Sequence, residues 1–128
     1  MTTRGLLVAL TLLAPAAARA QDEGIPVGTP APVVVVNDLE GRPVDLGTFI
    51  GRKALLLEFW ATWCNVCDEL LPRVRAAQQA YGDRVEFFGV NVTVNQTRER
   101  VKRWVEQHAP PYRTLYDDTG ASTRAYLA

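Results

Sequence analysis

The chain has 128 residues, 48% of them hydrophobic, with 14 basic and 14 acidic side chains. This length and composition predict one globular domain with a buried core, and they exclude a disordered or fibrous protein. The balanced charge provides no basic footprint for nucleic acid or for an anionic membrane surface. Function must therefore be read from particular residues rather than from bulk charge.

The first twenty residues have the composition of a secretory leader. Arg4 supplies a short positive region, an apolar stretch runs to Ala18, and Ala18-Arg19-Ala20 fits the small-x-small cleavage rule. We expect cleavage after Ala20 and a soluble mature protein in the bacterial periplasm. The alternative is an uncleaved membrane anchor, but the apolar stretch is shorter than the roughly 20 residues that span a bilayer. The mature chain would carry 12 basic and 14 acidic residues, which again gives no nucleic-acid footprint.

Residues 21–32 are rich in glycine, proline and charge, which predicts an extended lead-in. A β-branched run at 33–36, turn residues at 37–41 and alternating apolar residues to Leu46 predict a β-hairpin. Residues 46–52 contain two glycines and predict a short helical turn that packs Phe49 and Ile50 inward.

Residues 53–60 form a nearly continuous apolar run, interrupted by Glu58. A run without alternation is typical of a strand buried on both faces, so we expect a central strand. Glu58 is the exception that needs a reason, because an ionised carboxylate in such a strand is costly unless it is paired or exchanges a proton.

The spacing becomes helical after residue 64. Leu70, Val74, Ala77 and Tyr81 predict one apolar stripe, Pro72 predicts a kink, and Gly82 predicts the end of the helix. Residues 85–91 form another apolar run, so the pattern predicts a βαβ unit with parallel strands.

A second helix is expected to begin at a cap residue, Asn95 or Thr97, and to reach His108. Its apolar stripe comprises Val101, Trp104, Val105 and His108. Residues 112–116 predict a short extended segment, 117–120 a turn, and 121–128 the start of a further element. We therefore expect one α/β domain over residues 33–128.

Cys64 and Cys67 are the chain's two cysteines. A spacing of three places both sulfurs on one face of a helix that begins near Cys64, so they can form a disulfide with each other. A structural staple is the plain alternative, but a disulfide that closes so short a loop removes little unfolded-state entropy. Such tight pairs are more often reducible and catalytic.

The two cysteines should have different roles. A helix N-terminus stabilises a thiolate, so Cys64 is expected to attack a substrate disulfide and Cys67 to resolve the mixed disulfide. Glu58 could then accept the proton that Cys67 loses, directly or through water. The alternative is a glutamate that bends out to solvent at the strand end. Trp60 and Trp63 flank the site as candidates for substrate contact, although each is more often a core or cover residue.

FWATWCNVC, with Pro72 five residues after the second cysteine, resembles the thioredoxin superfamily and its exported TlpA/ResA-like branch of thiol-disulfide oxidoreductases. The resemblance covers roughly residues 27–128 and implies a thioredoxin-like fold, with Cys64 as nucleophile, Cys67 as resolving thiol and Glu58 as the buried acid. It implies protein thiol or disulfide substrates, an upstream membrane electron donor, and no metal or other cofactor. Val66 replaces the proline that many members have before the second cysteine, which leaves the direction of electron flow open. Members continue beyond residue 128 into a cis-proline segment, two strands and a helix, so we expect a domain that is incomplete at its C-terminus.

Three other functions stay open from the residues. Two thiolates could form a Cu(I)-binding module, although the single histidine leaves too few soft ligands for a closed zinc site. A redoxin-type peroxidase shares the general fold. An inactive fragment of a longer thioredoxin-like protein is the third alternative.

Overall fold

The computed structural model describes residues 24–128, so the expected leader at residues 1–20 lies outside the described part of the chain. The elements in order are β1 (Val35–Asp38), β2 (Pro43–Asp45), the 3-10 helix η1 (Leu46–Thr48), β3 (Ala54–Trp60), α1 (Asn65–Tyr81), β4 (Val85–Asn91), α2 (Arg98–His108), β5 (Arg113–Tyr116) and α3 (Ala121–Tyr126). Within residues 24–128, no helix has the length and apolar character that crossing a membrane requires.

The strands form one mixed five-stranded sheet in the order β2-β1-β5-β4-β3. β3 pairs in parallel with β4 from Ala54↔Val85 to Trp60↔Asn91, and β4 pairs in parallel with β5. β1 is antiparallel to both β2 and β5. The expected hairpin and the expected βαβ unit with parallel strands are both confirmed.

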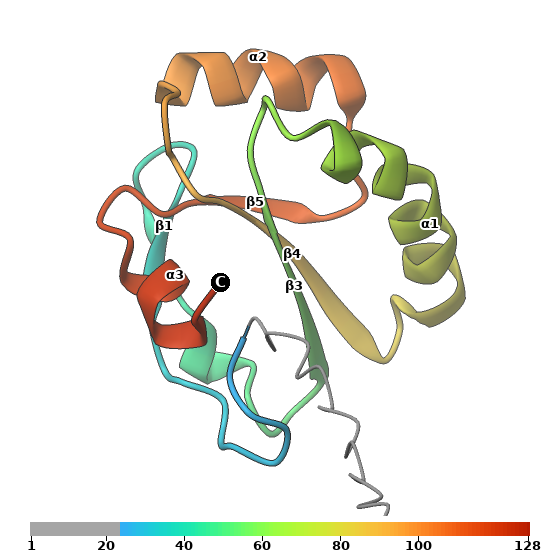
Figure 1. The fold of residues 1–128 in the computed structure, drawn as a ribbon. Helices are drawn as coiled ribbons and strands as arrows, with labels where there is room; N and C mark the ends of the chain where they lie inside the picture. Colours follow the sequence, from blue (N-terminus) through green and yellow to red (C-terminus); the bar gives the residue numbers. More distant parts are fainter. Residues whose placement is uncertain (1–23) are drawn as a thin grey trace, which may run out of the picture.

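Helices cover the two faces of the sheet unequally. α1 and α2 lie on one side, and the shorter α3 lies on the other (Figure 1). The first face buries an aromatic cluster that includes Trp60, Trp104 and Tyr116, with Cys67 packed against it. The opposite face buries an aliphatic cluster around Phe88 and Leu115. β3 and β5 thus contribute residues to both cores, and Cys67 belongs to the core on the side of α1 and α2.

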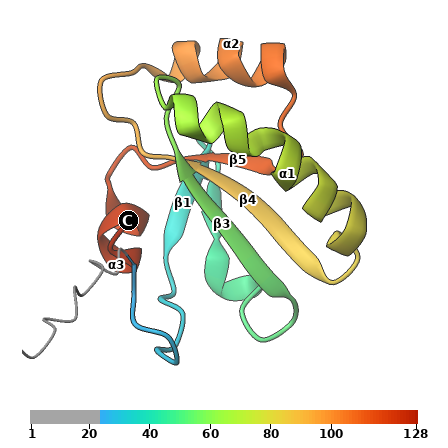
Figure 2. The ribbon, with the colours of Figure 1, turned by 45° about the vertical axis from the view of Figure 1, so that its right-hand side comes forward.

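β3 lies at the edge of this sheet, so the expectation of a central strand is wrong for the described residues. Among residues 24–128 it pairs with β4 alone. Figure 2 shows the chain running up β3 and turning into α1. The apolar run reflects packing on both faces, because Glu58 and Trp60 face the α1 side while Leu57 and Phe59 pack with the aliphatic cluster, although residues 55–59 are only half-buried. Cover on the faces does not specify a hydrogen-bonded neighbour at each edge.

The buried stripe of α1 also differs from the expected one. Leu71 and Val74 are buried, whereas Leu70 is 40% exposed and Tyr81 is 50% exposed. Cys67, Leu71 and Val74 follow one another at helical spacing, and Cys67 packs against the aromatic cluster that includes Trp60 and Trp104. Pro72 lies inside the helix as expected, and Gly82 caps its end.

α2 begins at Thr97, whose side chain accepts a hydrogen bond from the backbone N–H of Arg100. Asn95, the other candidate, has a left-handed backbone and lies before the helix. Val101 and Trp104 are buried as expected. Residues 121–126 form α3, and the carboxylate of Asp117 accepts hydrogen bonds from its first turn, including one of 2.8 Å from the N–H of Thr123.

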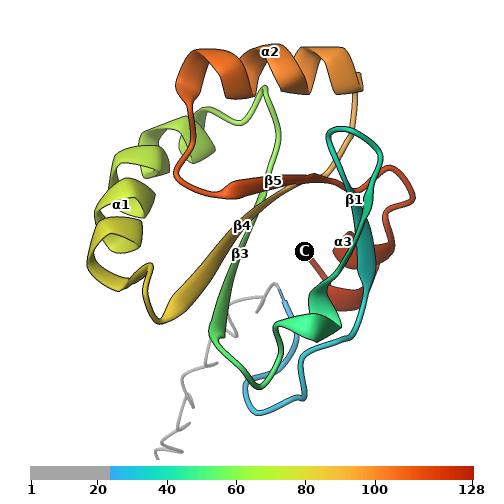
Figure 3. The ribbon, with the colours of Figure 1, turned by 180° about the vertical axis from the view of Figure 1, so that it is seen from behind.

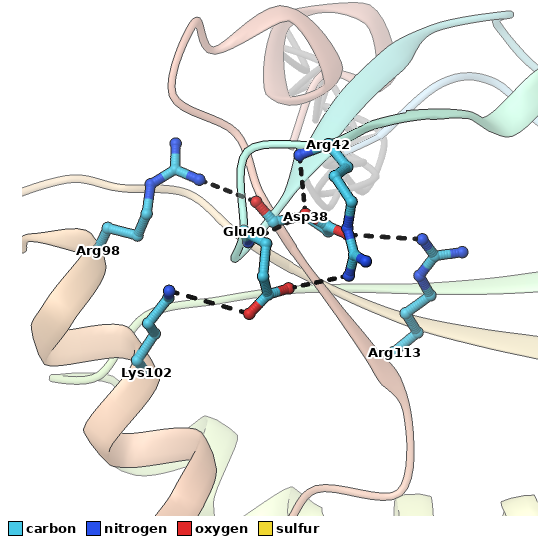
Figure 4. Close-up of polar contacts among 6 residues, drawn as sticks. All are labelled: Asp38, Glu40, Arg42, Arg98, Lys102 and Arg113. Atoms are coloured by element: carbon cyan, nitrogen blue, oxygen red, sulfur yellow. Dashed lines mark hydrogen bonds and ion pairs between the residues drawn. The ribbon is translucent and has the colours of Figure 1, made fainter.

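The tip of the β1–β2 hairpin reaches the start of α2 (Figure 3). Asp38 organises this tip, because its buried carboxylate accepts hydrogen bonds from the backbone N–H groups of Glu40 (3.0 Å) and Arg42 (2.9 Å) and from Nε of Arg42 (2.8 Å). The guanidinium of Arg98 in α2 donates to the carbonyl oxygen of Asp38 at 2.9 Å. Weaker ion pairs from Lys102 and Arg113 complete the network (Figure 4).

Asp38 should contribute to stability through its hydrogen bonds. We expect Asp38→Ala to lower the free energy of unfolding by about 1–3 kcal/mol, because two backbone N–H groups lose a buried acceptor. Glu40→Ala is the matched control, since its exposed ion pairs should contribute less than about 1 kcal/mol. Urea denaturation measures both, and equal losses would contradict the assignment.

The same carboxylate predicts a pH dependence. Burial alone would raise the pKa of Asp38, but hydrogen bonds from the backbone and side chain of Arg42 and from the backbone of Glu40 hold it below its ordinary 3.8. A depressed folded-state pKa stabilises the protein above the unfolded value, and that contribution is lost as the pH falls through the folded-state pKa. Asp38→Asn should therefore flatten the loss of stability below about pH 4, as measured by acid titration of the unfolding free energy.

Candidate active site at the start of helix α1

The two cysteines form a disulfide at the N-terminus of α1, with their Cα atoms 5.3 Å apart. Cys64 is the N-cap residue, with an extended backbone, and Cys67 lies in the first turn. Sγ of Cys64 accepts a hydrogen bond from the backbone N–H of Cys67 at 3.2 Å. The sulfur therefore occupies the position in which a capping oxygen usually satisfies a free helical N–H group.

The two sulfur atoms lie in different environments, so their thiols should ionise differently after reduction. After reduction, Sγ of Cys64 faces the free N–H groups and the positive end of the α1 dipole, which favour a thiolate. Cys67 packs against the aromatic cluster around Trp60 and Leu71. Its thiolate would lie against an apolar core, so it needs a nearby proton acceptor to ionise.

Glu58 lies in β3 on the face that α1 covers, two residues before Trp60. The side chain is half-buried, and among residues 24–128 its Oε2 atom is buried with no hydrogen-bond partner. Burial raises the pKa of Glu58 from its ordinary 4.5 to about 7. The carboxyl group can therefore exchange a proton near neutral pH.

The two tryptophans have different environments. Trp60 is 2% exposed, with its ring centroid 4.3 Å from that of Trp104, so it is a core residue and cannot touch a partner in this structure. Trp63 is 51% exposed, and its Nε1 donates to the carbonyl oxygen of Val94 at 2.8 Å. Trp63 is thus the tryptophan with a surface that a substrate could reach.

The loop from β4 to α2 holds the segment before Cys64 in place. The side-chain Oε1 of Gln96 accepts a hydrogen bond from the backbone N–H of Thr62 at 2.9 Å. The sequence reasoning missed Gln96 and Val94 as site residues. The available signal was their position after β4, because the carboxyl ends of parallel strands meet at one edge of a sheet.

Apolar side chains surround the disulfide on the surface. Trp63, Val66, Leu70 and Val94 are each at least 40% exposed. Exposed apolar groups that gather beside a reactive pair are typical of a surface that binds another protein. Within residues 24–128, no group of three or more His, Cys, Asp or Glu side chains is arranged to hold a metal ion.

Solved structures with a similar fold include thiol-disulfide proteins. The thioredoxin domain of a thiol-disulfide oxidoreductase from Bacteroides vulgatus matches with a TM-score of 0.67 at 25% identity, covering 79% of this chain and 73% of that one. A thiol:disulfide interchange protein of the thioredoxin family from Chlorobium tepidum TLS matches with a TM-score of 0.63 at 28% identity, covering 76% and 65%. The fold is therefore thioredoxin-like α/β, as expected.

Sequence comparisons place the chain more closely. A model of the AhpC/TSA family matches residues 27–128. Thiol-disulfide oxidoreductase ResA from Bacillus thuringiensis subsp. konkukian is 31% identical over 107 residues, which cover 83% of this chain and 60% of ResA. Thioredoxin-like protein YneN from Bacillus subtilis is 30% identical over 101 residues, covering 78% and 59%. The chain belongs to the AhpC/TSA family, as a TlpA/ResA-like member of the thioredoxin superfamily, and it spans about 60% of the length of these curated relatives.

Burial of Glu58 predicts a pH-dependent stability. A carboxyl whose pKa rises from 4.5 to about 7 on folding stabilises the folded state fully below pH 4.5, and this contribution is lost as the pH rises to about 7. The free energy of unfolding should therefore fall over this range in the oxidised protein, and Glu58→Gln should remove that part of the slope. Glu69→Gln, at an exposed position of α1, is the control. Urea denaturation at several pH values measures the slopes, and identical slopes in the parent and Glu58→Gln would contradict a buried protonated carboxyl.

Proposed function

We propose that this protein is a thiol-disulfide oxidoreductase that exchanges electrons with protein substrates through Cys64 and Cys67. The observation that carries the proposal is the disulfide at the N-cap of α1, with the exposed Trp63 beside it and a buried carboxyl on the adjacent strand. Family membership supports the same chemistry.

The reduction of a substrate begins at Cys64. Its thiolate attacks one sulfur of the substrate disulfide, forming a mixed disulfide and releasing the first substrate thiolate, which takes a proton from solvent. The N-terminus of α1 makes the Cys64 thiolate available near neutral pH.

The second step needs a thiolate at Cys67. Its thiol loses a proton to the carboxylate of Glu58, directly or through water, and the resulting thiolate attacks Sγ of Cys64. This attack releases the second substrate thiolate and forms the Cys64–Cys67 disulfide, so two electrons have passed to the substrate. An external dithiol must then reduce the protein before another cycle.

Two further features bear on the substrate class and on the location of the protein. Exposed apolar side chains around the disulfide favour a polypeptide substrate over a small thiol. The leader composition of residues 1–20 favours export, so we propose periplasmic protein substrates and an electron donor in the membrane.

Cys64→Ser should abolish insulin reduction with dithiothreitol as the electron source, because no nucleophile remains at the helix N-terminus. Cys67→Ser should instead accumulate a mixed disulfide with Cys64, because nothing resolves it. Turbidity of precipitating insulin and mass spectrometry under non-reducing conditions measure the two outcomes. A Cys64→Ser protein as active as the parent would rule out the proposal, as would peroxide consumption at Cys64 that proceeds without any disulfide reduction.

The proton acceptor can be tested separately. Glu58→Gln should slow the resolving step by about 10²-fold, because the Cys67 thiol loses its general base. In the parent protein the same step should slow as the pH falls through about 7, where Glu58 becomes protonated, and the variant should lack this dependence. Rapid mixing with acid quench follows the mixed disulfide, and Glu69→Gln is the matched control. An unchanged rate and pH profile in Glu58→Gln would assign the proton to another acceptor.

A further inference from the structure

Gly89 and Glu58 are direct neighbours across the β3–β4 pair. Cα partners in a parallel pair direct their side chains to the same face of the sheet, so a side chain at position 89 would stand beside that of Glu58. Glycine leaves this place empty. The sheet therefore has a gap next to the buried carboxyl, on the face that α1 covers.

The ring of Tyr112 fills that gap. A Cβ atom built on Gly89 would lie 2.2 Å from Cε2 and 2.5 Å from Cδ2 of Tyr112, so the ring rests directly on the backbone of β4. The ring centroid of Tyr112 is 6.4 Å from that of Trp60, and Tyr112 packs with Cys67 against the same cluster. One aromatic ring thus lies next to Glu58 and belongs to the cluster that Cys67 contacts.

We propose that Tyr112 is a positioning residue for Glu58, because its ring occupies the space that Gly89 leaves and shields the half-buried carboxyl from water on that side. The proposal rests on the role proposed above for Glu58. It assigns the contribution to the apolar ring rather than to the hydroxyl group, because ring carbons lie against the backbone of Gly89.

The charges around the ring agree with this arrangement. Burial raises the pKa of Tyr112, and the charges of Glu58 and then Asp68 raise it further, while Arg75 opposes them. The ionisable groups that act on the ring are therefore Glu58 from β3, and Asp68 and Arg75 from α1, while Cys67 in the same cluster is held in the disulfide. Arg75 donates to the backbone carbonyl of His108, which leaves it tied to the end of α2.

The test measures the pKa of Glu58 itself by carboxyl ¹³C NMR titration of the oxidised protein, in which both cysteines are held in the disulfide. Tyr112→Ala should admit water and move the pKa of Glu58 from about 7 toward 4.5. Tyr112→Phe, which keeps the ring, should leave it near 7. Tyr112→Leu keeps apolar bulk without a flat ring and should give a smaller change in the same direction, so it provides the measurement if Tyr112→Ala does not fold.

Tyr126→Leu is the matched control. Tyr126 packs its ring 6.1 Å from that of Phe59, the next residue along β3, but on the opposite face of the sheet. It should leave the pKa of Glu58 unchanged. An unchanged pKa in the folded Tyr112→Ala or Tyr112→Leu protein would overturn the proposal. So would a Tyr112→Phe or Tyr126→Leu protein in which the pKa falls as far as in Tyr112→Ala.

This measurement is independent of turnover. If Glu58→Gln leaves the resolving step unchanged, Glu58 is not the proton acceptor, yet the effect of Tyr112 on the Glu58 pKa would still be observed. Suppose instead that Glu58→Gln slows the resolving step but Tyr112→Ala leaves the pKa of Glu58 at about 7. Glu58 is then the proton acceptor, and Tyr112 is not its positioning residue.

Discussion

Parallel pairing of β3 with β4 is the constraint on which the site depends. Seven residues of each strand are in register, from Ala54↔Val85 to Trp60↔Asn91. The carboxyl ends of both strands lie at the same end of the sheet. There β3 leads into the turn before Cys64, and β4 leads into the loop that carries Val94 and Gln96. The same register sets Glu58 opposite a glycine. The cysteine pair, its supporting loop and the half-buried carboxyl of Glu58 are therefore placed by one set of backbone hydrogen bonds.

Glu58 shows a conflict between stability and chemistry. A half-buried carboxyl without a hydrogen-bond partner in the described residues lowers the stability of the fold whenever it is ionised. An apolar residue of similar size in β3 would avoid that cost. The cost is understandable if the group must hold or release a proton near neutral pH, because desolvation is what brings its pKa into that range.

Local features of this protein could be predicted from the sequence, and long-range ones could not. The helix start at Cys64 and the exceptional Glu58 follow from patterns within a few residues, and both are present in the structure. The expected stripe of α1 is right at Val74 and wrong at Leu70 and Tyr81. Leu70 and Leu71 are both apolar, and only the tertiary contact with the aromatic cluster selects Leu71. The edge position of β3 was missed because an apolar run reports cover above and below a strand, not beside it. The contact between Gly89 and Tyr112 joins residues far apart in the sequence, and neither residue type signals it alone.

The one-sided pairing of β3 also bears on motion. In a parallel pair, alternate residues of a strand direct their N–H and C=O groups to one neighbour, and the residues between them direct theirs the other way. Within residues 24–128 the groups of β3 that point away from β4 meet no strand. Their amide hydrogens should exchange with solvent faster than those of β4, which is paired on both sides. Local opening of β3, the strand that carries Glu58, should therefore cost less free energy than opening of β4, which is paired on both sides.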